Sequence, residues 1–173
     1  MNEEHVDNFY ETSIIDGDTT TNPGVRAFLS NYFKTTKVHC QGTCTKTDNN
    51  TYKSLSGVAI PGGISGDSCI QTASGMTICG ILNRAINGDS SRKCVSLTVD
   101  VNGLSQPNVA GRDIFSMDIH DDGSLSDYAS GCTTGNMGSA ANTCTTYDGE
   151  SGIKNAAAGC LNNIIDACWK MEY

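Results

Sequence analysis

The sequence has few charged residues, few aromatic residues and no long hydrophobic run. Charged side chains make up 17% of its 173 residues and aromatic side chains 6%, whereas charged residues are about 25% of typical domains. Lys and Arg number only 11 against 19 Asp and Glu, so the net charge is −8. The scattered basic residues exclude the usual nucleic-acid binder, which neutralises phosphates with a basic patch. No apolar run approaches the roughly 20 residues that span a bilayer, so the sequence as given is predicted to be soluble.

Motifs of the common enzyme classes are missing as well. The sequence contains no GxSxG, no HExxH and no phosphate-binding loop. Its three histidines, His5, His39 and His120, stand in unrelated contexts beside loop or turn residues, so we expect exposed turn histidines. Nine cysteines leave no single candidate for a thiol nucleophile. We therefore predict that the protein is not an enzyme.

What the sequence has in abundance is small polar residues and cysteine. Thr, Ser, Asn and Gly occupy 69 of the 173 positions. The length suits one domain with a real core, and we expect a single globular domain over residues 1–173. Residues 1–20 are polar and weakly patterned, and they are expected to be the frayed end of a helix.

The cysteine pattern predicts disulfides rather than a metal cluster. No two cysteines form a CxxC pair, and no zinc-finger spacing is present. Disulfides imply an oxidising compartment, whereas the polar residues that begin this sequence do not form an export signal. We therefore expect that Met1 replaces a removed segment. The spacing leaves the connectivity open, and the odd number leaves one cysteine unpaired. The disulfide candidates are Cys40, Cys44, Cys69, Cys79, Cys94, Cys132, Cys144, Cys160 and Cys168.

Apolar periodicity predicts a helix followed by an antiparallel sheet. Asn22 is a good N-cap and Pro23 a good first helical residue, and the amphipathic pattern that follows ends near Lys37. Cys40 and Cys44 could link the loop after this helix to a neighbouring segment. Strands are predicted at 54–60, 68–73, 76–82, 94–101, 113–119 and 124–128, with a hairpin turn at Ser74-Gly75.

The alternation within these strands predicts a sheet with two unlike faces. Val95, Leu97 and Val99 alternate with Ser96, Thr98 and Asp100. Such a sheet is typically covered by a helix on its apolar face and wet on its polar face. Residues 130–149 are predicted to form a long loop pinned by disulfides, and a last helix runs from Ser151 to about Cys168. The fold class is therefore predicted to be α+β, with helices at both ends of an antiparallel sheet.

The segment between two of the strands carries the most specific chemistry. Asp100, Asn102, Asn108 and Asp113 lie within 14 residues, and calcium prefers such carboxylate and amide oxygens. The opening D-x-N-G is similar to the first half of a calcium loop, but the bidentate Glu of an EF-hand is absent because position 111 is Gly. The alternative is a tight turn in which Gly103 and Gly111 adopt positive φ. Both interpretations stay open, and Ca²⁺ is the only cofactor the sequence suggests.

The same segment resembles type IV pilin-like proteins. The motifs that carry the resemblance are Asp100-Val101-Asn102-Gly103, Pro107-Asn108, Gly111-Arg112-Asp113-Ile114-Phe115 and Asp122-Gly123-Ser124-Leu125. The ending with Cys160, Ile164-Ile165 and Cys168-Trp169-Lys170-Met171 is similar to the C-terminal signature of these heads, and residues 25–40 resemble the segment that follows their long N-terminal helix.

The resemblance implies the soluble head of a type IV pilus subunit or of a type II secretion pseudopilin. Major pilin, minor pilin and pseudopilin all stay open. The leader and the hydrophobic helix of the family are absent from this sequence, so the upstream gene is expected to encode about 20 apolar residues after a short basic leader. Partners would be other pilin subunits, joined through that helix. The precursor would be anchored in the inner membrane, the mature head would be extracellular or at the cell surface, and the head alone would be monomeric. Calcium-binding pseudopilins are similar at their sheet–loop junction, which favours the metal interpretation of Asp100 to Asp113.

Two other classes of function remain as alternatives. The first is a secreted, disulfide-rich binding module or adhesin that recognises a carbohydrate or host surface through residues 130–149. The second is a secreted disulfide-rich enzyme. A typical cleaved signal peptide upstream would favour the binding module over the pilin-like subunit.

Overall fold

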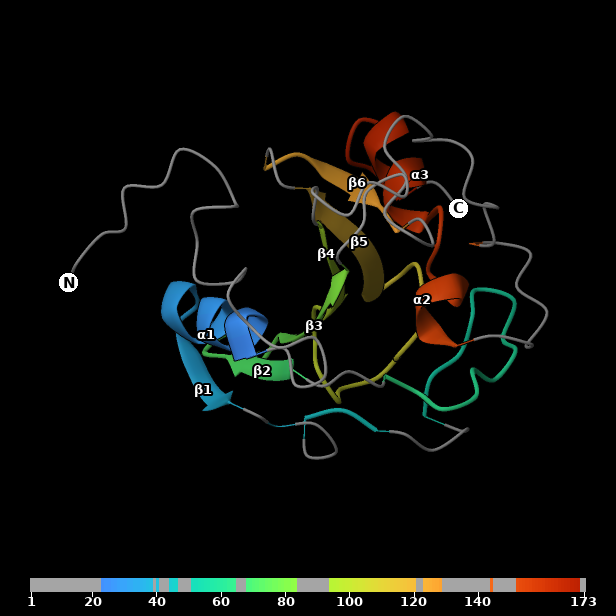
Figure 1. Ribbon diagram of the computed structural model, residues 1–173. Helices are drawn as coiled ribbons and strands as arrows, with labels where there is room; N and C mark the ends of the chain where they lie inside the picture. The colour runs from blue at the N-terminus through green and yellow to red at the C-terminus, as the bar shows by residue number, and fades with distance from the viewer. Residues whose placement is uncertain are drawn as a thin grey trace.

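A six-stranded antiparallel sheet forms the centre of the molecule (Figure 1). The computed structural model describes residues 23–38, 40, 44–46, 51–64, 68–83, 94–120, 123–128, 144 and 152–171. The strands are β1 (Thr35–Val38), β2 (Ser68–Thr72), β3 (Thr77–Asn83), β4 (Cys94–Asp100), β5 (Ile114–His120) and β6 (Leu125–Asp127). Their order across the sheet is their order along the chain. The predicted α+β class with an antiparallel sheet is therefore confirmed.

The middle strands lie where the alternation of the sequence places them. The predicted hairpin at 68–82 is formed by β2 and β3, in which Cys69 pairs directly with Cys79. The two cysteines are bonded to each other across the hairpin. β4 and β5 pair along their whole length, from Cys94 opposite His120 to Asp100 opposite Ile114.

The first helix is shorter than predicted. α1 spans Pro23–Tyr32, and β1 begins at Thr35, so the expected end near Lys37 is wrong. Three of the four residues of β1 are β-branched, which suits an extended backbone, and β1 pairs with β2 from Thr35 opposite Thr72 to Val38 opposite Ile70. The predicted N-cap Asn22 lies outside the described residues.

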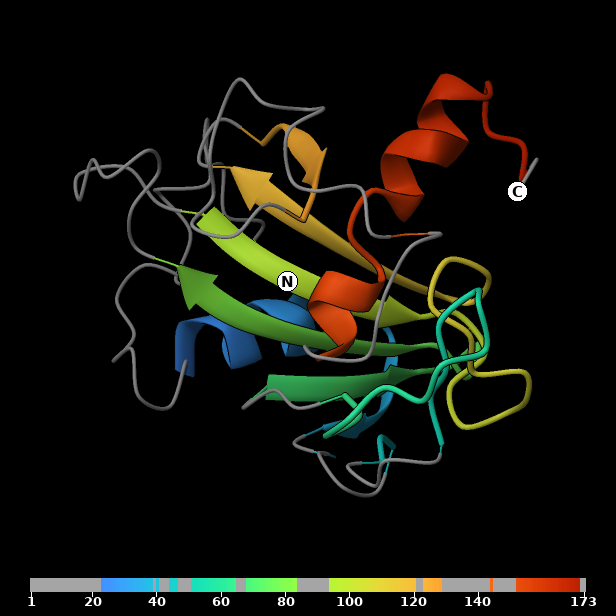
Figure 2. The same cartoon turned by 90° about the vertical axis from the view of Figure 1, so that its right-hand side faces the viewer.

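One face of the sheet is apolar and is covered by α1. Val25 and Leu29 of the helix are buried against Ile70, Ile78, Val95 and Leu97 of the strands. Gly80 permits this close packing, because a Cβ atom there would lie 2.7 Å from Cγ1 of Val25. Figure 2 shows α1 behind the strands, with the C-terminal helices on the other side.

The opposite face is also buried, which corrects the expectation of a wet polar face. Part of it is covered by α2 (Ile153–Ala156), whose Ile153 and Ala156 pack in one cluster with Cys69, Cys79 and Ile114. The polar residues of β4 and β5 on this face are buried as well: Ser96, Thr98, Asp100, Ser116, Asp118 and His120. Alternation identifies the two faces correctly, but it cannot show that a second layer covers the polar one.

The predicted C-terminal helix is divided into two short helices. α2 ends at Ala156, and α3 spans Cys160–Asp166 after a break at Gly159, whose φ is 84°. Asp127 of β6 holds the start of α3, because its Oδ1 accepts the Gly159 N–H and its Oδ2 accepts the Asn162 N–H, both at 2.9 Å. The sequence leaves residues 169–173 undecided between a helix and a strand, and their described part, 169–171, forms neither.

The predicted strand at 54–60 is instead a folded loop. Ser54 and Val58 close a turn by a backbone hydrogen bond of 2.9 Å, and Lys53 makes only isolated bridges to Ala59 and Val109. Tyr52 anchors the loop, since its side chain is fully buried and its hydroxyl accepts the Lys46 N–H.

Disulfides join three pairs of cysteines within the described part of the chain. The pairs are Cys40–Cys44, Cys69–Cys79 and Cys144–Cys160, so Cys40 and Cys44 bond each other rather than a neighbouring segment. Cys94 is also disulfide-bonded, Cys168 is free and exposed, and Cys132 lies outside the described residues. Several disulfides indicate an extracellular or other oxidising environment. Among the described residues, no helix is long and apolar enough to cross a membrane.

Candidate functional site

The four predicted ligand residues come together where the β4–β5 loop closes. Asp100 is the last residue of β4, and Asp113 stands immediately before β5. The Val101 N–H donates to the Asp113 carbonyl at 2.8 Å, which brings the two ends of the loop side by side. Asn102 and Asn108 lie within the loop itself. This sheet–loop junction is therefore one compact polar site.

Asp113 closes the loop with two short hydrogen bonds. Its Oδ2 accepts the Asn108 N–H at 2.7 Å, and its Oδ1 accepts the Val109 N–H at 2.6 Å. The side chain is buried, so these charge-assisted bonds are shielded from water. Asp113 thus has a structural role that requires no bound ion.

Asp100 is less well satisfied than Asp113. It is completely buried, and its Oδ1 accepts the Asn102 N–H at 3.3 Å, whereas its Oδ2 has no hydrogen-bond partner among the described residues. Burial, and after it the negative charge of Asp113, raises the pKa of Asp100 from 3.8 to about 7. Ionisation of a carboxyl group in this environment is energetically unfavourable unless a cation binds beside it.

The two asparagines arrange further oxygens around the junction. Asn102 donates from Nδ2 to the Gln106 carbonyl at 3.2 Å, and its buried Oδ1 has no partner in the part of the chain that the structure describes. The amide of Asn108, with its nitrogen turned inward, donates to the carbonyls of Ser105 at 3.0 Å and Gly103 at 3.1 Å. These carbonyl oxygens therefore point into the loop rather than toward solvent.

The oxygens at this junction are of the type that hard cations bind. It offers the two partnerless oxygens of Asp100 and Asn102, together with the charge of a second carboxylate. Ca²⁺ accepts carboxylate, amide and backbone oxygens in irregular geometry, so such a mixture is suitable. Within the described ranges no group of three or more His, Cys, Asp or Glu side chains could hold a metal ion. A site here would thus depend on amide and main-chain oxygens.

The glycines of the loop are needed for packing as well as for turning. Gly103 has φ +62°, and a Cβ atom there would lie 2.6 Å from the Gly75 carbonyl in the β2–β3 turn. Gly111 has φ +89°, and its Cβ would lie 2.8 Å from Sγ of Cys160. The tight-turn interpretation is therefore correct for the backbone, and it is compatible with a bound ion.

A second polar cluster, which the sequence did not reveal, lies on the buried polar face of the sheet. Ser96 donates to Oδ1 of Asp118 at 2.6 Å, and His120 Nε2 shares a hydrogen bond of 2.8 Å with the Ser126 hydroxyl. His120 and Asp118 are both buried, so the expectation of an exposed turn histidine is wrong for His120. Asp121 and Asp122, as well as His5 and His39, lie outside the described residues.

Two titratable groups border this cluster. The Lys154 Nζ lies 5.6 Å from the ring centre of Tyr128. Burial lowers the pKa of Lys154, and the charge of Asp118 partly opposes that shift. Burial, and then Asp118, raises the pKa of the Tyr128 hydroxyl. The cluster does pair a hydroxyl, Ser126, with an imidazole, His120, but both side chains are buried and His120 Nδ1 has no hydrogen-bond partner among the described residues. We therefore infer that the cluster holds β5, β6 and α2 together.

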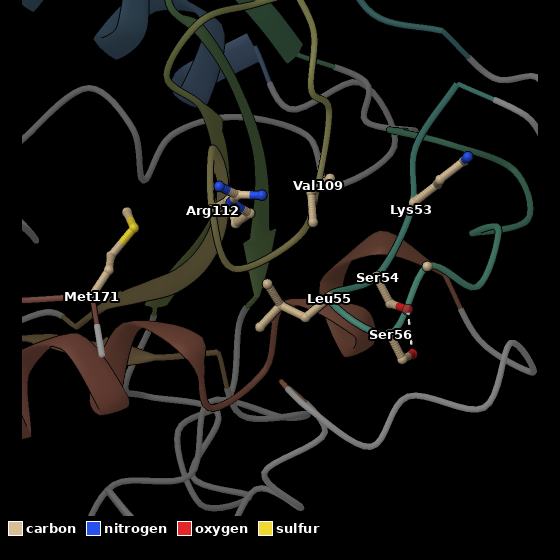
Figure 3. A pocket seen from close by; sticks show the side chains of 8 residues that line it. Lys53, Ser54, Leu55, Ser56, Val109, Arg112 and Met171 are labelled. Atoms are coloured by element: carbon tan, nitrogen blue, oxygen red, sulfur yellow. Dashed lines mark hydrogen bonds between the residues drawn. The ribbon is translucent and has the colours of Figure 1, made fainter. Parts of the chain in front are cut away.

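An open groove lies on the surface beside the β4–β5 loop (Figure 3). Its volume is about 730 Å³, and it is bounded by the 53–57 loop, by the 109–112 turn and by the C-terminal tail. The lining residues are Lys53, Ser54, Leu55, Ser56, Gly57, Val109, Arg112 and Met171. The predicted contact loop of an adhesin, 130–149, lies outside the described residues except for Cys144.

No family model, curated protein or solved structure matches this chain. Its function must therefore be inferred from the residues themselves and from the geometry of the site.

Proposed function

We propose that the chain is the globular head of a type IV pilin-like structural subunit, in a pilus or in a type II secretion pseudopilus. The observation that carries the proposal is the helix α1, which lies on the apolar face of an antiparallel sheet with Val25 and Leu29 completely buried. A head of this kind must hold an N-terminal helix firmly, because that helix would transmit the contacts between subunits.

The composition and the cross-links support the same proposal. A subunit displayed outside the cell needs a polar surface and resistance to unfolding, and here small polar residues are combined with disulfides. The D-x-N-G and G-R-D-I-F motifs that suggested the family fold into a single hydrogen-bonded junction. No chemistry is required of the head, since its role is mechanical.

In this proposal Ca²⁺ stabilises the sheet–loop junction. The bound ion would supply positive charge to Asp100 and Asp113 and would be coordinated by the partnerless oxygens of Asp100 and Asn102. The protein's part is to hold these oxygens in place through the Asp113 hydrogen bonds and the Asn102–Gln106 contact. The ion would act on stability alone.

Immunogold electron microscopy tests the structural role. Antibodies raised against this chain should label surface filaments of cells that express the complete gene, and the upstream reading frame should encode a basic leader followed by about 20 apolar residues. If the protein is found only free in the medium after cleavage of an ordinary signal peptide, the filament proposal is wrong and the secreted binding module is favoured.

Calcium is tested by thermal unfolding of the full chain with CaCl₂ or with EDTA. Removal of the ion should lower the melting temperature of the wild type. Asp113→Ala is a poor probe of the ion, because it also removes two backbone hydrogen bonds. Asn102→Ala is the sharper variant, because it removes a partnerless oxygen and only one exposed side-chain hydrogen bond, to Gln106, and it should abolish most of the calcium effect. An identical melting temperature of the wild type in CaCl₂ and in EDTA would show that the loop binds no calcium and is only a tight turn.

A further inference from the structure

The groove beside the β4–β5 loop presents two cations, Lys53 and Arg112. Both are exposed, and neither side chain makes a hydrogen bond or an ion pair with any residue that the structure describes. The nearest carboxylate along the chain, Asp113, is buried and already accepts two backbone N–H groups. The groove is thus a basic site on an acidic protein.

The negative charge of the protein is concentrated in its first 22 residues. That segment carries six of the 19 acidic residues and none of the 11 basic ones, so it accounts for six units of the net charge of −8. The acidic residues are Glu3, Glu4, Asp7, Glu11, Asp16 and Asp18. The rest of the chain is close to neutral.

The groove and the acidic segment 1–22 match in their apolar residues as well as in their opposite charges. Leu55 and Val109 contribute apolar lining between the two cations, and Met171 extends the lining on the far side of Arg112 (Figure 3). The acidic segment intersperses its carboxylates with Phe9-Tyr10 and Ile14-Ile15. A segment of this composition can pair its carboxylates with Lys53 and Arg112 while its apolar side chains cover the lining of the groove.

We propose that residues 1–22 of one copy of this chain bind the groove between Lys53 and Arg112 of a second copy. The choice of a second copy as partner rests on the proposed function, because a filament subunit must contact its neighbours. Exposed ion pairs are individually weak, so the contact would give specificity and register between heads rather than high affinity.

Carbodiimide cross-linking of the full chain tests the proposal, because this reagent joins a lysine amine to a carboxylate in contact with it. Equal amounts of ¹⁴N-labelled and ¹⁵N-labelled chain are mixed at low salt, cross-linked and digested. Mass spectrometry should find Lys53 joined to carboxylates of residues 1–22 in species of mixed isotope. Lys37, which is exposed on β1, is the control and should form several-fold fewer of these links.

Salt and one substitution sharpen the result. A concentration of 0.5 M NaCl should remove most of the Lys53 links, since exposed charges are screened over a few ångströms at that ionic strength. Arg112→Gln, which removes only the second cation, should lower the yield of Lys53 links about threefold, as expected for one exposed ion pair. The links of Lys37 should not change.

Two outcomes would overturn the inference. Links of Lys53 in single-isotope species only would show that the segment reaches the groove of its own chain. Equal yields at Lys53 and Lys37 would show that the groove has no preference for the segment. Filaments that contain the protein but lack the Lys53 link would refute this contact and leave the proposed function unaffected. Mixed-isotope Lys53 links in a protein that forms no filaments would support the contact and refute the proposed function.

Discussion

Replacement of Asp100 by asparagine should stabilise the ion-free protein at alkaline pH and destabilise it at acidic pH. The wild-type carboxyl has a pKa of about 7 in the fold, against 3.8 as its ordinary value. The folded state therefore binds this proton more tightly than the unfolded chain does. Stability consequently falls as pH rises from about 4 to about 7 and is level on either side of that window.

The magnitude follows from the size of the shift. Each pKa unit corresponds to about 1.36 kcal/mol, so the ionised Asp100 costs the fold up to about 4 kcal/mol above pH 7. An asparagine side chain at this position cannot ionise, and it keeps the oxygen that accepts the Asn102 N–H. Its amide nitrogen would replace the partnerless Oδ2, and an unpaired buried donor costs about 1–3 kcal/mol. We therefore expect Asp100→Asn to be more stable than the wild type by about 1–3 kcal/mol at pH 8 and less stable by up to about 2 kcal/mol at pH 4.5, where the wild type has already lost about 1 kcal/mol.

Urea unfolding of both proteins in EDTA, at pH 4.5 and pH 8, measures this reversal. At pH 8, CaCl₂ at a hundredfold excess over its dissociation constant should raise the free energy of unfolding of the wild type by about 2.7 kcal/mol. The same addition should leave the free energy of unfolding of Asp100→Asn nearly unchanged. Asp166→Asn, at an exposed position on α3, is the matched control and should shift neither curve. If the difference between Asp100→Asn and wild type is the same at both pH values, a raised pKa at Asp100 is refuted.

Three further predictions concern the scaffold. Asp127→Ala should lower the free energy of unfolding by about 1–3 kcal/mol, because it leaves two backbone N–H groups at the start of α3 without their acceptor; unchanged urea unfolding would contradict this. Gly111→Ala combines positive φ with a clash against Cys160 and should cost more than about 1 kcal/mol, which thermal unfolding would detect. The oxidised chain should weigh about eight hydrogens less than the reduced chain and should react with iodoacetamide only at Cys168; labelling elsewhere would show a different pairing.

Local sequence patterns predicted the sheet well because its strands pair with their neighbours along the chain. The hairpin of β2 and β3 was predicted with Cys69 and Cys79 on opposite arms, and the structure pairs them directly in register. The bond between them was not predicted, because spacing alone leaves the connectivity open. β4 was equally clear, since Val95 and Leu97 alternate with polar residues over a full strand. The four candidate ligand residues lie close together as expected, because the backbone hydrogen bond from Val101 to Asp113 closes the loop that carries them.

The errors arose where long-range contacts override local preference. The segment 35–38 follows a helical pattern, but pairing with β2 draws it into the sheet. Gly159 divides the last helix because Asp127, 32 residues earlier, accepts its N–H and fixes a new helix start. Asp118 and His120 are buried because other segments cover their face of the sheet. The alternation of residues within β5 cannot predict such a covering layer.

The agreement between strand order and chain order has a consequence for how the protein is made. Each strand finds its partner in the strand that has just preceded it, and the three described disulfides close loops with sequence separations of only 4, 10 and 16 residues. Local contacts of this kind form quickly and require no distant part of the chain. A chain that folds in an oxidising compartment can therefore form the sheet progressively, from β1 and β2 onward, and close local disulfides as it does so.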